Sequence, residues 1–280
     1  MIVLSLSTEF EARQAMGSSQ IRLWPSDPQW SNYPDALKEL GASSAATDLL
    51  DQNAAQSANV ATTDQWAGFK DSLANSIVIT SLVVVANVIS CSLVGYGFAR
   101  LRFRGSKPLF LITLATMMLP HQVTMVPLFL LFRSIGWVDT ILPLVVPSFF
   151  GTAFFIFMFR QFFSQTPEEL LEAGRIDGAS ELGVWWRIML PMCKPVAAIT
   201  AIFSFIWTWN DFMNPLIYLQ SPENFTLALA INTFKSQFGD MNKAHLLMAA
   251  SVVVMMPCVL LFFAAQRYFV QGLNLGAIKG

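Results

Sequence analysis

The sequence predicts an all-α integral membrane protein. Of its 280 residues, 54% are hydrophobic and only 12% are charged, and the mean hydropathy is +0.52. Five long runs carry almost no charge, and none shows the strict alternation of a membrane β-strand. Only helices and closed barrels satisfy the backbone in lipid. We therefore expect five full transmembrane helices plus the remnant of a first, with a helix-turn-helix hairpin on the cytoplasmic side.

Residues 1–8, MIVLSLST, have the composition of the end of a hydrophobic segment. The run is too short to span a bilayer, and it lacks the basic start and the small-residue cleavage site of a signal peptide. We expect residues 1–8 to be the remnant of a first transmembrane helix.

Residues 9–71 are the only part with a soluble composition. Pro34 to Leu40 is predicted to form a short helix, and Gly41–Thr63, rich in Ala, Ser, Asn and Gln, a weak helix or a loop. No residues here have catalytic spacing. We expect a solvated lobe on the external side.

Five segments are long enough to cross the hydrocarbon core as helices, which rise 1.5 Å per residue. The predicted spans are Leu73–Ala99, Leu109–Phe132, Thr140–Phe159, Pro195–Leu219 and Leu246–Gln266. In the first of them, Gly95 and Gly97 indicate a close approach to a neighbouring helix.

The basic residues near the span ends set the orientation. One side of the predicted membrane holds Arg100, Arg102, Arg104, Lys107, Arg160, Arg175, Arg187, Lys194, Arg267 and Lys279. The other side holds Arg133, Lys235, Lys243 and the acidic N-terminal lobe. Residues 166–191 and the C-terminus are therefore predicted to be cytoplasmic, and residues 9–71 external.

The segment 166–191, TPEELLEAGRIDGASELGVWWRIMLP, is charged although both of its neighbours are hydrophobic. Thr166 is predicted to be the N-cap of a first helix, with Pro167 at N1 and a capping box to Glu169. Leu170, Ala173 and Gly174 are expected to share one face of that helix.

Asp177-Gly178 predicts a sharp turn, because glycine accepts the positive φ that such turns need. A second helix is expected after it, ending at Pro191. The residues expected on one side of that helix are Leu182, Trp185, Trp186 and Met189.

This segment resembles the EAA loop of ABC-importer permeases. The resemblance rests on Glu172-Ala173-Gly174, on Gly178 four positions after Gly174, and on Ile188-Met189-Leu190-Pro191. The spacing fits throughout, and the one departure is Gly174 where the family has its second Ala. That change loosens a helix by about 1 kcal/mol.

Further motifs resemble the carbohydrate-uptake permeases related to the second membrane subunit of the maltose system. They are Tyr96 to Gly105, Met118 to Pro120, Trp209 to Phe212, Pro215-Leu216 and Gly276 to Gly280. The similarity covers roughly residues 70–280.

The resemblance implies that residues 72–280 form an ABC permease transmembrane domain in a bacterial inner (plasma) membrane, taking up a sugar or sugar derivative. It implies as partners an ABC ATPase in two copies, a second permease and an extracellular solute-binding protein, and it implies no cofactor. The residues that would couple the permease to the ATPase are Glu172, Ala173, Gly174, Asp177, Gly178, Ile188, Leu190 and Pro191.

Asp211 is the one acidic residue within a predicted span, and such residues are candidates for function. It lies ~24 Å along the helix from Pro195, near the external end. Asp211 and Asn210 either cap or join helices there, or together with Trp209 line the exit of a translocation path, where the indole could stack on a sugar ring.

Several classes of function are disfavoured. The chain has no G-x-x-x-x-G-K-[ST] motif, so it has no P-loop of its own for ATP. No catalytic constellation stands out, the three cysteines lack metal-ligand spacing, and a net charge of −1 gives no sign of nucleic-acid binding. An ion-coupled secondary carrier and a membrane-anchored enzyme remain alternatives. A secondary carrier normally has ionisable groups at mid-membrane and an internal sequence repeat. A membrane-anchored enzyme would need a cluster of polar residues that faces water on one side.

Overall fold

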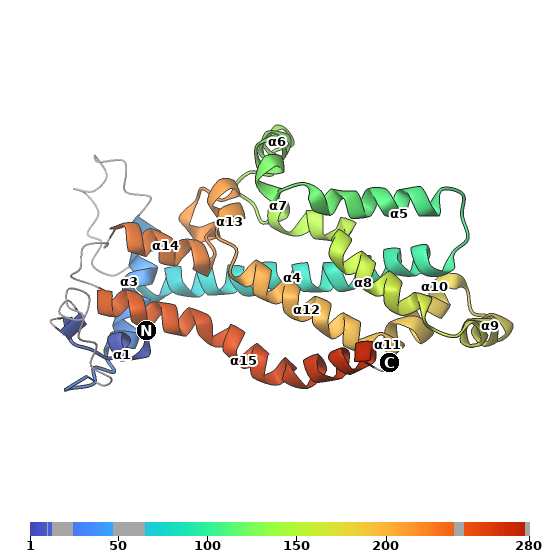
Figure 1. Cartoon of the computed structure of the whole chain (residues 1–280). Helices are drawn as coiled ribbons and strands as arrows, with labels where there is room; N and C mark the ends of the chain where they lie inside the picture. The colour runs from blue at the N-terminus through green and yellow to red at the C-terminus, as the bar shows by residue number, and fades with distance from the viewer. Residues whose placement is uncertain (10, 13–24, 47–64, 238–243, 278–280) are drawn as a thin grey trace. The chain divides into compact units, whose positions relative to one another are not determined.

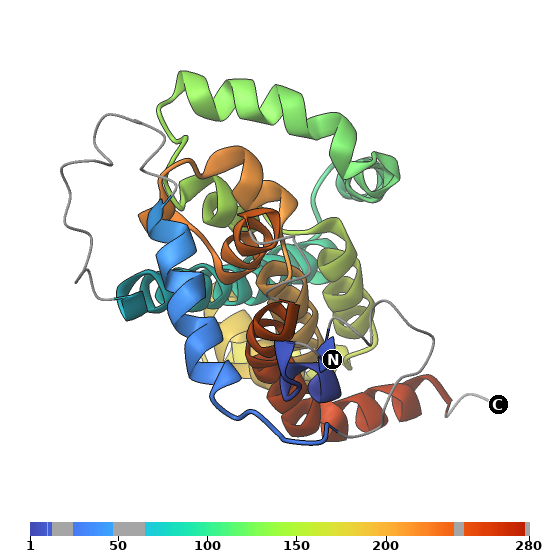
Figure 2. The same cartoon turned by 90° about the vertical axis from the view of Figure 1, so that its left-hand side faces the viewer.

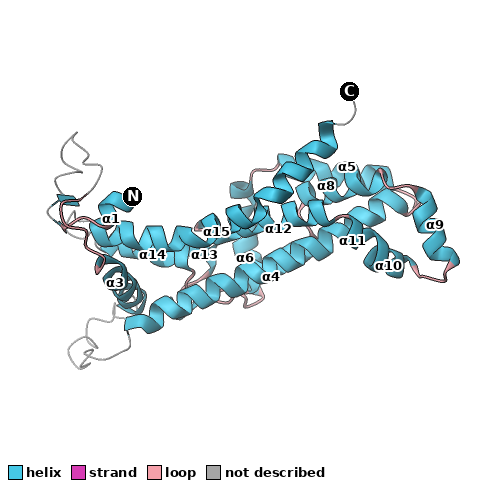
Figure 3. Cartoon of the chain, turned by 90° about the horizontal axis from the view of Figure 1, so that it is seen from below, coloured by secondary structure: helices cyan, strands magenta, loops and turns pink. Residues whose placement is uncertain are grey.

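The computed structural model describes residues 1–9, 11–12, 25–46, 65–237 and 244–277. Over these residues every regular element is a helix and none is a strand (Figure 3). The chain divides into two compact units. The first unit comprises Met1–Val78, Val138–Ile141 and Trp209–Leu260, and the second comprises Ile79–Trp137, Leu142–Thr208 and Leu261–Gly280.

The first unit contains the N-terminal lobe. Its short helices are α1 (Ile2–Ser5), α3 (Asn32–Ala46), α13 (Met213–Tyr218), η5 (Pro222–Asn224) and α14 (Leu227–Gln237). The amide of Asn32 donates to the carbonyls of Ser5 (2.9 Å) and Ser7 (3.0 Å) and so ties α1 to the start of α3, which packs on α14. The helix predicted at Pro34–Leu40 is confirmed and is longer. Residues 10, 13–24 and 47–64 of the predicted lobe lie outside the described residues.

A loop at one edge of this unit is organised by Asp139, a non-glycine residue with φ 64°. Its carboxylate accepts hydrogen bonds from the backbone N–H groups of Gln220 and Ser221 (both 2.9 Å) and from the Ser221 hydroxyl (2.5 Å). Asn224 also donates to it (3.2 Å). Partial burial raises the pKa of Asp139, but these donors together outweigh burial and lower it to about 2.

The first predicted span is one long helix, α4 (Gln65–Arg100). The helix begins eight residues before Leu73. The charges of Lys70 and Asp71 mark the end of the hydrophobic run in the sequence, but charged residues do not terminate a helix. The close approach predicted at Gly95 is confirmed in the second unit. A Cβ at Gly95 would lie 2.7 Å from the Cβ of Phe159 and 3.0 Å from the backbone N of Arg160. At Gly97, by contrast, no described residue comes within 4 Å of an added Cβ.

The second predicted span is broken. It consists of α5 (Ser106–Ala115), η2 (Thr116–Met118) and α6 (His121–Ser134), with a bend of 100° between η2 and α6. Figure 2 shows α6 from the side and α5 almost end-on. Pro120 excludes its predecessor from the α region, and Leu119 is accordingly extended (φ −80°, ψ 118°). The predicted span Leu109–Phe132 is therefore a pair of helices with a sharp bend at Pro120.

The third span, Leu142–Ser164, contains α7 (Leu142–Val145), η3 (Val146–Phe150) and α8 (Ala153–Ser164). Gly151 interrupts it with φ 83°. Polar side chains of α4 bind the break: the Thr152 hydroxyl donates to Asn87 Oδ1 (2.9 Å), and the Thr152 N–H to the sulfur of Cys91 (3.2 Å). Beyond the break, α8 buries Phe155, Phe159 and Phe163 on one face.

The fourth predicted span, Pro195–Leu219, also differs in the structure from the single helix expected. Its helix, α12 (Lys194–Trp209), ends ten residues early, and α13 follows after the break at residues 210–212. The last span lies in α15 (Ala244–Ala277), which contains Pro257. The described chain has three helices long and apolar enough to cross a membrane, or up to five if each bent pair is one span.

Candidate functional site

The hairpin predicted at residues 166–191 lies in the second unit. Its first arm is α9 (Glu168–Ile176) and its second begins with α10 (Glu181–Val184), as Figure 1 shows. Pro167, with ψ 140°, is the N-cap of α9, so the N-cap prediction for Thr166 is wrong by one residue. Thr166 is buried instead, and its carbonyl accepts a hydrogen bond from Arg100.

The turn between the arms is a Schellman motif. Gly178 has φ 83°, its N–H donates to the carbonyl of Arg175, and the N–H of Ala179 donates to the carbonyl of Gly174, both at 3.0 Å. These are the two bonds that close a helix through a left-handed residue. The positive φ predicted for Gly178 is thus confirmed.

The second arm starts at Ser180, whose hydroxyl accepts from the N–H of Gly183 (3.2 Å) and caps α10. A π-helical turn, Trp185–Met189, follows, and then α11 (Leu190–Met192). Pro191 lies inside this arm rather than ending it. A proline ring clashes with the carbonyl four residues before it, here that of Arg187, and the wider π turn accommodates that clash.

One side of the hairpin is buried in a cluster with α4 and α8. The hairpin residues in this cluster are Leu171, Val184, Trp185 and Met189. The face predicted for the first arm is wrong by one position: Leu171 (1% exposed) and Gly174 are buried, whereas Leu170 and Ala173 are exposed. On the second arm Trp185 and Met189 are buried as predicted, but Leu182 and Trp186 point away from the cluster and are exposed.

The two arms meet at Gly174. A Cβ built there would lie 2.5 Å from Cδ1 of Ile188 and 3.6 Å from Cγ2 of Val184. Glycine therefore leaves room for the end of the Ile188 side chain. The departure from the family's alanine loosens α9 and also brings the second arm closer.

Two side chains near the end of α4 hold this hairpin. The Tyr96 hydroxyl donates to Glu181 Oε2 (2.6 Å), and Glu181 Oε1 accepts from Nε of Arg175 (2.8 Å). This ion pair links α9 to α10 across the turn and raises the pKa of Arg175, chiefly through the hydrogen bond to Glu181. Arg100 donates to the carbonyls of Phe163 (2.5 Å) and Thr166, where α8 ends and the hairpin begins.

The second predicted site lies in the first unit, where α12 ends. Trp209 is 4% exposed, and its indole N–H donates to the carbonyl of Val254 (3.0 Å). Asp211 accepts from the backbone and the side-chain amide of Asn214 (3.2 and 2.7 Å) and so caps the start of α13. Asn210 is exposed. In this structure Asp211 joins two helices, which is the first of its two predicted roles.

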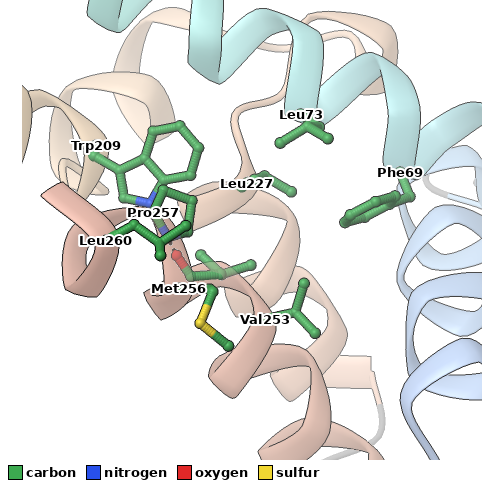
Figure 4. Close-up of a pocket in the computed structure, with 9 residues that line it drawn as sticks. Phe69, Leu73, Trp209, Leu227, Val253, Met256, Pro257 and Leu260 are labelled. Atoms are coloured by element: carbon green, nitrogen blue, oxygen red, sulfur yellow. Dashed lines mark hydrogen bonds between the residues drawn. The ribbon is translucent and has the colours of Figure 1, made fainter.

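Trp209 also borders an apolar cavity of ≈ 220 Å³ in the first unit (Figure 4). The other lining residues are Phe69, Leu73, Leu227, Val253, Val254, Met256, Pro257 and Leu260. The hydrogen bond from the indole of Trp209 to Val254 anchors the end of α12 to α15. Over the described residues, no group of three His, Cys, Asp or Glu side chains could hold a metal ion.

Comparison with known proteins identifies the family. Residues 91–275 match the model of the binding-protein-dependent transport system inner membrane component. The match covers most of the chain, the hairpin included. The chain belongs to this family.

Curated relatives agree with this assignment. The permease is 37% identical over 206 residues to the arabinooligosaccharides transport system permease protein AraQ of Halalkalibacterium halodurans, covering 74% of this chain and 73% of the relative. It is 35% identical over 220 residues to the melibiose/raffinose/stachyose import permease protein MelC of Bacillus subtilis, covering 76% and 78%.

A solved structure has the same fold. It is that of a bacterial ABC transporter involved in the import of the acidic polysaccharide alginate, with a TM-score of 0.73 and 23% identity. The match covers 95% of this chain and 88% of the other. Membership of the family confirms the resemblance stated from the motifs, and it makes the permease a transport component rather than an enzyme or an ion-coupled carrier.

The structure brings some predicted coupling residues together and leaves others apart. Gly174 and Ile188 meet inside the hairpin, whereas Glu172, Asp177 and Gly178 are exposed on its outer side. Ala173 and Pro191 are also exposed, and Leu190 is half-buried.

Sequence reasoning missed Tyr96, Arg100 and Glu181. A signal was present, because Tyr96 and Arg100 are four residues apart and therefore share one helix face.

Proposed function

We propose that the permease is one of two membrane subunits of an ATP-driven importer that carries a sugar or an oligosaccharide across a bacterial inner membrane. The relatives named for arabinooligosaccharides and for melibiose, raffinose and stachyose support this class of cargo. An extracellular solute-binding protein would deliver the cargo, and two copies of an ATPase would supply the energy.

The observation that carries this proposal is the outer surface of the hairpin. Ile176 is 84% exposed, Leu182 63% and Trp186 56%, and the acidic Glu172 is exposed as well. Large hydrophobic side chains left exposed on both arms of the hairpin favour an interface with another protein. We assign the ATPase as the partner because the opposite side of the hairpin is fixed in the core of the second unit and can transmit a push.

The proposed orientation follows from charge. With the hairpin and the C-terminus in the cytoplasm, Arg102, Arg104 and Lys107 lie on the same side as the hairpin, as the positive-inside rule requires. The N-terminal lobe and the Asp139 loop are then external.

A place on the translocation path stays a prediction for Trp209, Asn210 and Asp211. Of the three, Asn210 is exposed and can contact a passing solute, whereas the indole of Trp209 would first have to leave Val254. We therefore expect Asn210→Ala to raise the solute KM more than Trp209→Phe does.

The test is transport by the reconstituted importer. Glu172→Lys reverses a charge in the proposed interface, and Ile176→Asp places a carboxylate there that would be buried on docking. Both solute uptake and solute-stimulated ATP hydrolysis should therefore fall at least tenfold in each variant. Asp35→Lys reverses an exposed charge on α3 and serves as the matched control. Wild-type uptake and hydrolysis in both hairpin variants would exclude this surface as the ATPase contact. Uptake that depends on an ion gradient but not on ATP would exclude the proposed function as a whole.

A further inference from the structure

The end of α4 holds the hairpin at two points. Arg100 binds the Thr166 carbonyl where the hairpin begins, and Tyr96 binds Glu181 where the second arm starts. The two side chains are four residues apart on one face of α4. The hairpin is thus attached directly to a membrane-spanning helix, in addition to being joined in sequence to α8 and α12.

Tyr96 is placed to act through its hydroxyl alone. The side chain is 2% exposed, and its ring packs edge-on against Phe163 with 6.2 Å between the centroids. Glu181 is a shared acceptor: its Oε2 accepts from the Tyr96 hydroxyl, and the Arg175 guanidinium donates to Oε1 (2.8 Å) and, more weakly, to Oε2 (3.4 Å). One carboxylate therefore joins α4, α9 and α10.

The same region of α4 cannot slide along α8. Gly95, next to Tyr96, brings the two helices so close that an added Cβ would reach backbone atoms of α8. A tilt of the hairpin is therefore resisted by packing at α8 and reaches α4 through the directional Tyr96–Glu181 bond. Hydrogen bonds weaken steeply once their geometry is lost.

We propose that Tyr96 is a positioning residue of the transport cycle, whose hydroxyl, through Glu181, makes α4 follow the movement of the hairpin. This inference rests on the proposed function, since it assumes that the hairpin receives the motion of an ATPase. It predicts that loss of the hydroxyl separates ATP hydrolysis from solute movement while the importer still assembles.

The experiment compares Tyr96→Phe, Glu181→Gln and Glu181→Ala in the reconstituted importer, measuring solute imported per ATP hydrolysed. Tyr96→Phe should lower this ratio about fivefold or more, the range of coupling between linked sites. Glu181→Gln keeps an acceptor oxygen and should retain most of the ratio, whereas Glu181→Ala should lose it. Tyr96→Phe combined with Glu181→Ala should be no worse than Glu181→Ala alone.

Tyr33→Phe is the matched control, because it removes a hydroxyl of α3 that is hydrogen-bonded to Ser5 of α1 (2.9 Å). The inference is overturned if Tyr96→Phe leaves the ratio unchanged. It is also overturned if the variant only reduces assembly or melting temperature and the assembled importers keep the wild-type ratio. If Ile176→Asp and Glu172→Lys are also fully active, the proposed function itself has failed. If they are inactive while Tyr96→Phe is fully coupled, only this inference has failed.

Discussion

The contact between Gly174 and Ile188 permits a quantitative prediction. Replacing Gly174 by Ala adds a methyl group in the interior of α9, which favours the helix by about 1 kcal/mol. The same methyl would lie 2.5 Å from Cδ1 of Ile188, where about 3.5–4.0 Å is needed. The end of the Ile188 side chain must therefore rotate, at a cost of about 0.5–1.5 kcal/mol. The two effects nearly cancel, and Gly174→Ala alone should change stability by less than about 1 kcal/mol.

Ile188→Val removes the methyl group that causes the conflict. Alone, it should cost about 0.5–1.5 kcal/mol, because it leaves a gap beside Gly174. In the Gly174→Ala background it should cost almost nothing, since the alanine methyl then fills that gap without strain. The double-mutant cycle should therefore give a favourable coupling free energy of about 0.5–1.5 kcal/mol, within the range for residues in contact.

The assay is the apparent melting temperature of the purified permease in detergent, where 1 kcal/mol corresponds to about 2–4 °C for a domain of this approximate size. The double variant should melt at least as high as the wild type, and Ile188→Val below it. If the two changes are additive within about 0.3 kcal/mol, the arms do not meet at Gly174 and the reasoning is refuted.

Three further predictions concern other positions. Gly178→Val should cost about 1–3 kcal/mol through its φ of 83°, while Gly178→Asn, which tolerates that conformation, should cost much less; melting temperatures that fall equally would contradict the Schellman turn. Gly95→Ala should lower stability by about 1–3 kcal/mol by forcing α4 from α8, whereas Gly97→Ala, the matched control, should be neutral or stabilising; equal melting temperatures would disprove the close approach. Asp139→Asn should destabilise the first unit by about 1.5–3 kcal/mol at neutral pH. Because the pKa of Asp139 is lowered to about 2, its stabilisation is present above about pH 4 and is lost as the pH falls toward 2, so a melting-temperature difference from wild type that persists undiminished at pH 2 would rule out this role.

The elements that depend on composition and on local turn chemistry could be predicted from the sequence. The hydrophobic runs located the three described helices that are long and apolar enough to cross a membrane, and Asp177-Gly178 located the turn of the hairpin, because a positive φ is a local requirement of the backbone. The helix breaks at Leu119-Pro120 and at residues 210–212 were harder to predict from the sequence. A proline in a hydrophobic run is compatible with either a kink or a full break, and tertiary contacts decide between them.

The face of α9 could not be predicted from periodicity alone. Leu170 and Leu171 both fit an amphipathic helix, and only the position of α8 and of the second arm decides which one is buried. Likewise, the link from Tyr96 to Glu181 spans 85 positions of sequence, which no local pattern records.

The most direct test of the central claim is photo-cross-linking from the hairpin in intact inner membranes. A photoreactive phenylalanine analogue replaces Ile176, which is 84% exposed, and a second variant carries it at Trp30, which is 65% exposed in the N-terminal lobe. We expect position 176 to capture a subunit whose peptides contain a P-loop ATP-binding motif, and position 30 not to capture it. Capture of that subunit from position 30, or of only lipid or the solute-binding protein from position 176, would contradict the account.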